Sequence, residues 1–176
     1  MNSIERTKAR EILLERKTRG HHVDERVLGR IDTAKSMFSL SLDDADAFFS
    51  LIWQESDPAR LLTPSGQPRT LRDVAERLVQ KYSFAQLCTT LGLPPTQHDP
   101  DWFRTCLTIE ESFSYEALGV VSLLPSNDPE QRQSQTGTFY IFDGVHKTLV
   151  LATLLLRNLI PYQPVNALLF VPRNSS

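Results

Sequence analysis

Apolar residues recur at helical spacing through the first part of the chain. The positions with this spacing are Val23, Val27, Leu28, Ile31, Ala34 and Phe38, preceded by the sparser Ile4, Ile12 and Leu13. A period near 3.6 residues is typical of one apolar face of a helix. We therefore predict two helices, separated near Gly20, that together reach Phe38.

Local signals predict a third helix after residue 41. Ser41, Asp43 and Asp44 can begin it, because acidic groups stabilise the unpaired N–H groups of a first turn. Its apolar side would consist of Phe48, Phe49, Ile52 and Trp53. Residues 57–68 contain three prolines and one glycine, which predicts a loop.

Residues 70–91 predict two packed helices. Thr70 and Asp73 form an approximate capping box for the first, over 70–81, and Gly92 closes the second, over 83–91. Such a pair is also the outline of a helix-turn-helix. A recognition helix needs groups that reach base edges and phosphates, however, and residues 83–91 include no basic residue. We favour packed helices over DNA reading here, and expect a helical first half.

The second half mixes short helices with strands. Helices are predicted at 101–107, 109–115 and 145–158, strands at 120–124, 138–142 and 165–171, and a polar loop at 125–137. These elements predict an α+β fold. A helical N-terminal half, residues 1–95, would pack on a small α/β core, residues 96–176, as one compact unit.

Composition and charge argue against several classes of protein. The formal net charge of −2 and a pI near 6.1 argue against nucleic-acid binding through a large, uniform positive field. Two cysteines without a CxxC motif or clustered histidines predict no zinc site and suit a reducing, cytoplasmic setting. The charged N-terminus is unlike a secretory signal, and the apolar run 149–156 is far shorter than the ~20 residues of a membrane span.

Charge is concentrated at the N-terminal end. Residues 1–35 carry nine Lys and Arg against six Asp and Glu. Because acids are interspersed, we favour the solvated faces of two helices over a dedicated polyanion patch.

The segment Asp143-Gly144-Val145-His146-Lys147-Thr148 holds the chemistry that stands out most in the sequence. A strand that ends in Asp-Gly and turns at once into a helix presents unpaired backbone N–H groups, which favour an anion. Gly144 allows a sharp turn, and His146, Lys147 and Thr148 add a titratable donor, a cation and a hydroxyl. The helix terminus alone contributes only ~0.3–1 kcal/mol, so the side chains must supply most of the affinity.

Two other interpretations of this turn bear on its function. A Walker A loop requires an earlier glycine and a different spacing between glycine and lysine, so a P-loop NTPase is not expected. A plain strand-to-helix turn with a solvated Lys147 is the alternative that spacing alone leaves open.

From about Trp102 to Val171 the chain resembles the ParB/sulfiredoxin superfamily. The matching segments are EESFSYEALGVVSLLP (Glu110–Pro125), FYIFDGVHKTLVLATLLL (Phe139–Leu156) and PVNALLF (Pro164–Phe170). The second segment, with its D-G-x-H-[RK] turn, is the most specific. The resemblance implies a small ParB/sulfiredoxin-like α/β core.

In that superfamily the turn holds nucleotide phosphates, and the preceding helix supplies hydroxyls and an acidic residue for the nucleotide or its metal. The resemblance implies nucleotide binding by Thr108, Ser112, Gly144, His146, Lys147 and Thr148. It implies catalytic roles for Glu111, Asp143, His146 and Lys147, with Mg²⁺ held by Glu111 and Asp143. Glu110 remains an alternative to Glu111.

The departures from the superfamily limit what carries over. Sulfiredoxins have a catalytic cysteine where this chain has Val145, so sulfinic acid reduction is not expected. ParB-type proteins usually have arginine at the position of Lys147 and a DNA-reading domain after the core. Lysine keeps the charge but loses the forked, bidentate geometry for phosphate.

A helical segment fused to a degenerate core of this type resembles the Osa-type oncogenic-suppression and fertility-inhibition factors of conjugative plasmids. The resemblance implies a plasmid-encoded protein that blocks DNA transfer through a type IV secretion system. It also implies ATP binding, ATP hydrolysis and metal-dependent DNA cleavage, and a coupling protein as partner. The expected location is cytoplasmic, or peripheral at the inner membrane through that partner.

Two other functions are alternatives to this one. A binding module without chemistry would dock its helical half and loop 125–137 on a protein of the secretion machinery. A ParB-like, sequence-specific DNA-binding protein would show steep salt dependence together with discrimination between sequences.

Overall fold

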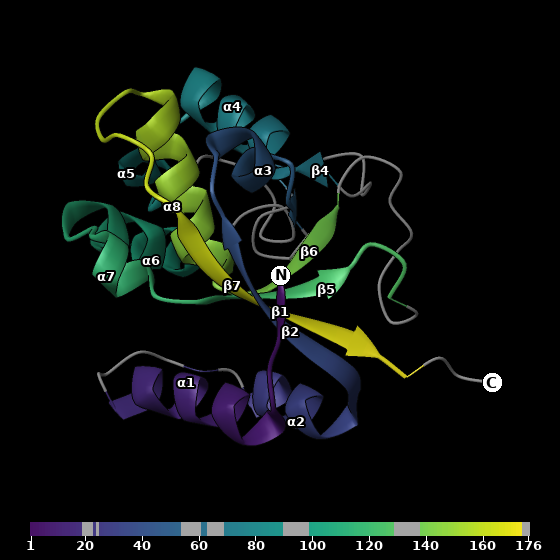
Figure 1. Cartoon of the computed structure of the whole chain (residues 1–176). Coiled ribbons are helices and arrows are strands. Elements are labelled where there is room, and N and C mark those ends of the chain that lie inside the picture. Colours follow the sequence, from purple (N-terminus) through teal and green to yellow (C-terminus); the bar gives the residue numbers. More distant parts are fainter. Residues whose placement is uncertain are drawn as a thin grey trace.

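The computed structural model describes residues 1–18, 23, 25–53, 61–62, 69–89, 99–128 and 138–173. Within them, seven strands form one mixed sheet (Figure 1). In spatial order these are β1 (Asn2–Ser3), β2 (Ala34–Leu42), β7 (Val165–Pro172), β5 (Val121–Pro125), β6 (Phe139–Asp143), β3 (Ile52–Trp53) and β4 (Arg69–Thr70). The pairs β5–β7 and β3–β6 are parallel, and the other pairs are antiparallel.

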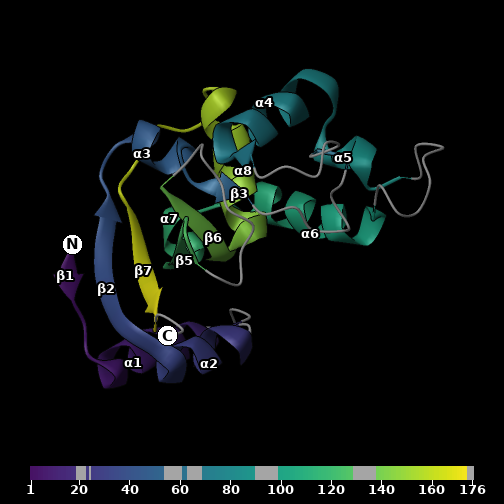
Figure 2. The ribbon, with the colours of Figure 1, turned by 90° about the vertical axis from the view of Figure 1, so that its right-hand side faces the viewer.

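Helices cover both faces of this sheet (Figure 2). One side carries α1 (Arg6–Thr18) and α2 (Glu25–Thr33). The other carries α3 (Ala45–Phe49), α4 (Leu71–Lys81), α5 (Phe84–Leu87), α6 (Pro100–Glu111), α7 (Tyr115–Leu118) and α8 (Val145–Leu156). None of the helices in the described parts of the chain is long and apolar enough to cross a membrane.

Strand β7 shows how the sheet separates two hydrophobic cores. Leu168 and Phe170 pack with α1 and α2, whereas Ala167 and Leu169 pack with α4, α6 and α8. Successive side chains of a strand point to opposite faces, so a strand buried on both sides is apolar throughout. The sequence VNALLFV of this strand fits that position.

The α+β class predicted from the sequence is confirmed. The positions of several elements are as expected: α1 and α2 separate near Gly20, and a complete capping box at Thr70 and Asp73 begins α4. The three predicted strands of the second half and helix α8 also form, with small shifts at their ends.

The prediction that the first half is helical is wrong at residues 34–42 and 52–53. Residues 34–42 form strand β2, which pairs along its whole length with β7. Ala34 and Phe38 are four residues apart, a spacing that suits a helical turn and also the two-residue repeat of a strand. Helix α3 ends at Phe49. Ile52 and Trp53, which the sequence places on that helix, form strand β3 instead. The sheet therefore draws strands from both sides of residue 95.

The helices predicted over residues 101–115 form differently, and the predictions for Gly92 and two loops fall largely outside the described residues. The two short helices expected at 101–107 and 109–115 are instead one helix, α6, followed by the single turn α7. Gly92, expected to close the fifth helix, lies outside the described residues, as do most of the predicted loops 57–68 and 125–137.

Candidate anion site at the first turn of α8

The turn between β6 and α8 has the backbone geometry of an open helix N-terminus. Gly144 is the N-cap residue and adopts a left-handed conformation, φ +94°, which side-chain-bearing residues rarely tolerate. It makes no side-chain cap hydrogen bond, and Thr148 N–H is the first to bond back, to the Gly144 carbonyl at 2.9 Å. The backbone N–H groups of this first turn lie at the positive end of a 12-residue helix.

The turn lies where ligands commonly bind in sheets with helices on their faces. Strands β3 and β6 are parallel, with Ile52 opposite Tyr140, so their carboxyl ends lie side by side. Trp53 ends β3, Asp143 ends β6, and Gly144 follows directly. Crevices outside the carboxyl ends of parallel strands are preferred ligand sites.

Three aromatic side chains form a continuous stack beside the turn. The ring centroids of His146 and Trp102 are 4.3 Å apart, with the rings tilted by 30°. Trp102 meets the Trp53 ring edge-on, with centroids 6.2 Å apart. Trp53 is fully buried, and its indole Nε1–H finds no acceptor among the described residues. Buried tryptophan N–H groups usually have a partner, so this donor offers a hydrogen bond to an added group.

Burial sets the protonation of His146. Desolvation lowers the pKa of His146 below its ordinary value of 6.5, and the nearby Asp143 carboxylate only partly opposes this. The imidazole is therefore neutral at pH 7. A neutral ring stacked on Trp102 can accept or donate one hydrogen bond, but it does not add positive charge to the turn.

This pKa makes stability depend on pH in a defined direction. Above pH 6.5 His146 is neutral in both the folded and the unfolded chain; below it the unfolded chain binds a proton that the folded protein excludes. We expect the free energy of unfolding to fall as pH drops below 6.5, by at most about 1.4 kcal/mol per pH unit. Urea unfolding of wild type and His146→Gln from pH 8 to pH 5 measures this. Parallel pH profiles for the two proteins would contradict the assignment.

Lys147 and Thr148 are occupied by the protein itself. Lys147 Nζ donates to the Ala117 carbonyl in α7, which ties that turn to α8. The buried Thr148 hydroxyl donates back to the carbonyls of Gly144 and Val145, at 2.9 and 3.1 Å. Lys147 would have to leave Ala117 to reach a ligand, whereas Thr148 contributes through its position within the turn.

The hydroxyls and carboxylate predicted on the preceding helix lie toward its other end. Trp102 contacts His146 near the N-termini of α6 and α8, and Glu110 pairs with Arg157, at 2.9 Å, near their C-termini. Glu111 follows Trp102 by nine residues, about 13 Å along a helix. Thr108 and Ser112 also donate to helix carbonyls, of Arg104 and Thr108. Thus Asp143, Gly144, His146, Lys147 and Thr148 come together, while Thr108, Glu111 and Ser112 lie apart from them.

Glu110, the alternative to Glu111, forms an ion pair with Arg157. Across the described parts of the chain, no group of three or more His, Cys, Asp and Glu residues could hold a metal ion.

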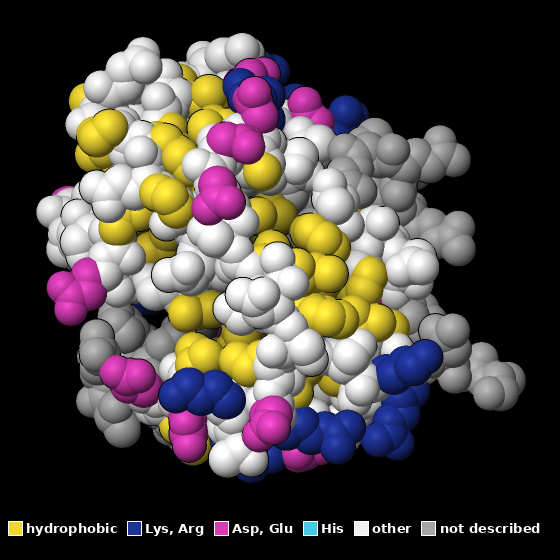
Figure 3. Space-filling view, viewed as in Figure 1, with side chains coloured by type: hydrophobic (Ala, Val, Ile, Leu, Met, Phe, Trp, Pro, Cys, Tyr) yellow, Lys and Arg dark blue, Asp and Glu magenta, His cyan; other side chains and the backbone are white. Residues whose placement is uncertain are grey.

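Most cations described at the N-terminal end have partners. Arg6 donates to the Ala34 carbonyl, Lys8 pairs with Glu11, and Arg10 pairs with Asp32. Figure 3 shows Lys and Arg side chains along the lower edge of the molecule, over α1 and α2, with Asp and Glu among them. This distribution agrees with solvated helix faces.

Trp53 and Trp102 each lie in an apolar helical context in the sequence, which favours core positions for both. Trp53 is indeed buried in the core, but through β3, and Trp102 joins it to His146. Their proximity depends on β3 lying beside β6, which no local pattern signals.

Comparisons with models of protein families, with curated proteins and with solved structures give no significant match to this chain.

Proposed function

We propose that the first turn of α8 binds the phosphate group of a nucleotide, with ATP as the first candidate. The observation that carries the proposal is the helix N-terminus at the left-handed Gly144, an N-cap without a side-chain hydrogen bond, beside the His146–Trp102–Trp53 stack. Backbone donors and the helix dipole favour a phosphate there. The half-buried rings of His146 and Trp102 suit a ligand that also carries a heteroaromatic ring.

Calorimetric titration of ATP, CTP and ADP, with and without Mg²⁺, tests this proposal. Lys147→Ala should weaken binding about tenfold, because a hydrogen bond from a charged group typically contributes 1.5–3 kcal/mol. Binding should also change the tryptophan fluorescence of the wild type, since Trp102 lies against His146. Lys8→Ala, which removes an exposed lysine on α1, is the matched control.

The two variants separate the outcomes. A folded wild type that binds no nucleotide would overturn the proposal. Binding that is undiminished in Lys147→Ala would assign Lys147 to fastening α7 and leave the backbone turn as the site. Circular dichroism and thermal unfolding of each variant establish that the fold is intact.

By its resemblance to fertility-inhibition factors, we propose further that the chain blocks DNA transfer through a type IV secretion system. Two versions of this function differ in chemistry. In one, ATP hydrolysis and DNA cleavage use the turn together with Glu111 and a metal. In the other, the protein binds a nucleotide and the coupling protein without chemistry.

The separation of Glu111 from the turn, and the engagement of Lys147 and Thr148 with carbonyls, favour the version without chemistry. A mating assay decides between them. Glu111→Ala and His146→Ala proteins that still block transfer support binding alone, and loss of the block in both supports catalysis.

A further inference from the structure

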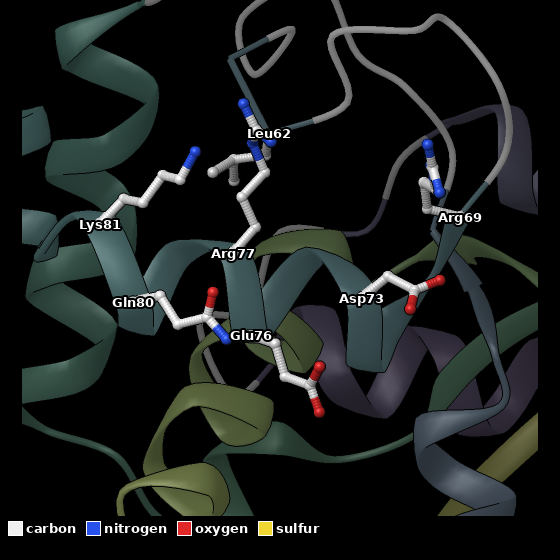
Figure 4. Close-up of a pocket in the computed structure, with 7 residues that line it drawn as sticks. All are labelled: Leu62, Arg69, Asp73, Glu76, Arg77, Gln80 and Lys81. Atoms are coloured by element: carbon white, nitrogen blue, oxygen red, sulfur yellow. The ribbon is translucent and has the colours of Figure 1, made fainter.

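A second hollow, of about 320 Å³, runs along α4 on the described surface (Figure 4). Its lining from β4 and α4 consists of Arg69, Asp73, Glu76, Arg77, Gln80 and Lys81, with Leu62 opposite. Ligand sites for small molecules begin at about this size. The described lining residues are almost all polar and include no aromatic residue, in contrast to the turn of α8.

Two cations of this hollow, Arg77 and Lys81, have donors to spare. Arg77 Nε donates to the Leu61 carbonyl at 3.1 Å, which orients the guanidinium and leaves its two terminal nitrogens without a partner in the part of the chain that is described. Lys81 follows four residues later, and its exposed ammonium makes no hydrogen bond or ion pair with the described residues. Figure 4 shows both side chains extending to the same side of α4. Residues four apart on a helix are neighbours on its surface.

The two acidic side chains that line the hollow contact other groups of the protein. Asp73 accepts from the Thr70 N–H in the capping box. Glu76 lies 3.9 Å from Arg72, and in Figure 4 it extends to the opposite side of α4 from Arg77 and Lys81. The side of α4 that carries Arg77 and Lys81 therefore keeps a positive excess.

We propose that this hollow is a binding site for a small, hydrophilic phosphate monoester, of the sugar-phosphate type. The fixed fork of Arg77 can hold two phosphate oxygens while Lys81 supplies a point charge. The volume exceeds that of a bare phosphate, and a lining without aromatic rings suits a hydroxyl-rich body better than a nucleobase. This site is separate from the turn of α8 and does not depend on the function proposed for it.

Titration of glycerol 3-phosphate into the ¹⁵N-labelled full chain, followed by NMR, tests the site. We expect saturable shifts of the backbone amides of residues 73–81. Lys81→Gln and Arg77→Gln should each weaken binding about tenfold, which corresponds to one charge-assisted hydrogen bond. Lys8→Gln, the same change at an exposed lysine of α1, should leave the affinity unchanged.

The competing outcomes each have a distinct signature. Shifts that grow linearly without saturation, or equal weakening in Lys8→Gln and Lys81→Gln, would overturn the site in favour of diffuse charge screening. Equal shifts with glycerol would overturn the role of the phosphate. Lys147→Ala should bind glycerol 3-phosphate normally, so failure at α8 and failure at α4 are told apart.

Discussion

Replacing Arg30 with alanine is expected to lower the free energy of unfolding by about 3–5 kcal/mol. Arg30 on α2 lies 3.5 Å from the carboxylate of Asp128, whose side chain is fully buried, and its guanidinium also covers the Phe142 ring, 5.5 Å from the centroid. Removing the arginine takes a countercharge away from a buried carboxylate. Urea unfolding at pH 7 measures the difference.

The matched control is Arg10→Ala. Arg10 and Asp32 form a shorter ion pair, 2.8 Å, but both side chains are about half exposed or more, at 47% and 65%. Pairs in water contribute about 1 kcal/mol or less, because solvent screens the attraction. If burial rather than distance decides the effect, Arg30→Ala is the far more damaging change. Similar losses in the two variants would show that Asp128 is not dependent on Arg30.

Trp53→Ala is expected to destabilise the protein by about 3–5 kcal/mol, the range for truncating a large buried aromatic side chain. Trp53 is 0% exposed and contacts Trp102 across the space between β3 and α6. Its loss would open a cavity under the α8 turn. The variant should also weaken nucleotide binding, because Trp102, which packs on His146, loses its contact with Trp53.

Trp53→Phe isolates the indole N–H. Because this donor has no acceptor among the described residues, the phenylalanine variant should lose less than half as much stability as Trp53→Ala. It should bind nucleotide more weakly than wild type if the ligand accepts the N–H. Equal destabilisation by alanine and phenylalanine would mean that the indole is bonded within the folded protein, and the donor would then be unavailable to a ligand.

Local sequence patterns predicted those elements whose own residues carry a strong structural preference. The capping box at Thr70, the Asp-Gly turn before α8 and the apolar strand 165–171 each have a strong short-range preference, and each forms. Residues 34–42 could not be assigned in the same way. Their apolar spacing suits a helix and a strand equally, and the pairing with β7, more than a hundred residues away, decides between them.

The part of the candidate site that lies within one short segment was predicted from the sequence, and the part contributed by a second helix was not. Residues 143–148 are contiguous, so their proximity follows from one turn. The helix before them was expected to bring Glu111 to that turn, but the position of α6 is set by packing of Trp102 on His146 and by the Glu110–Arg157 pair. Such contacts between elements have no signature in the periodicity of either one.

The place of β7 in the sheet has a consequence for folding during synthesis. β7 lies between β2 and β5, and it is the last strand of the described chain. Among the described strands, β2 therefore has only β1 to pair with until residues 165–172 have emerged from the ribosome. Because pairing across such a sequence separation is slow, β2 spends translation with an exposed edge. We expect nascent chains that stop before residue 165 to be the species that chaperones bind and proteases degrade.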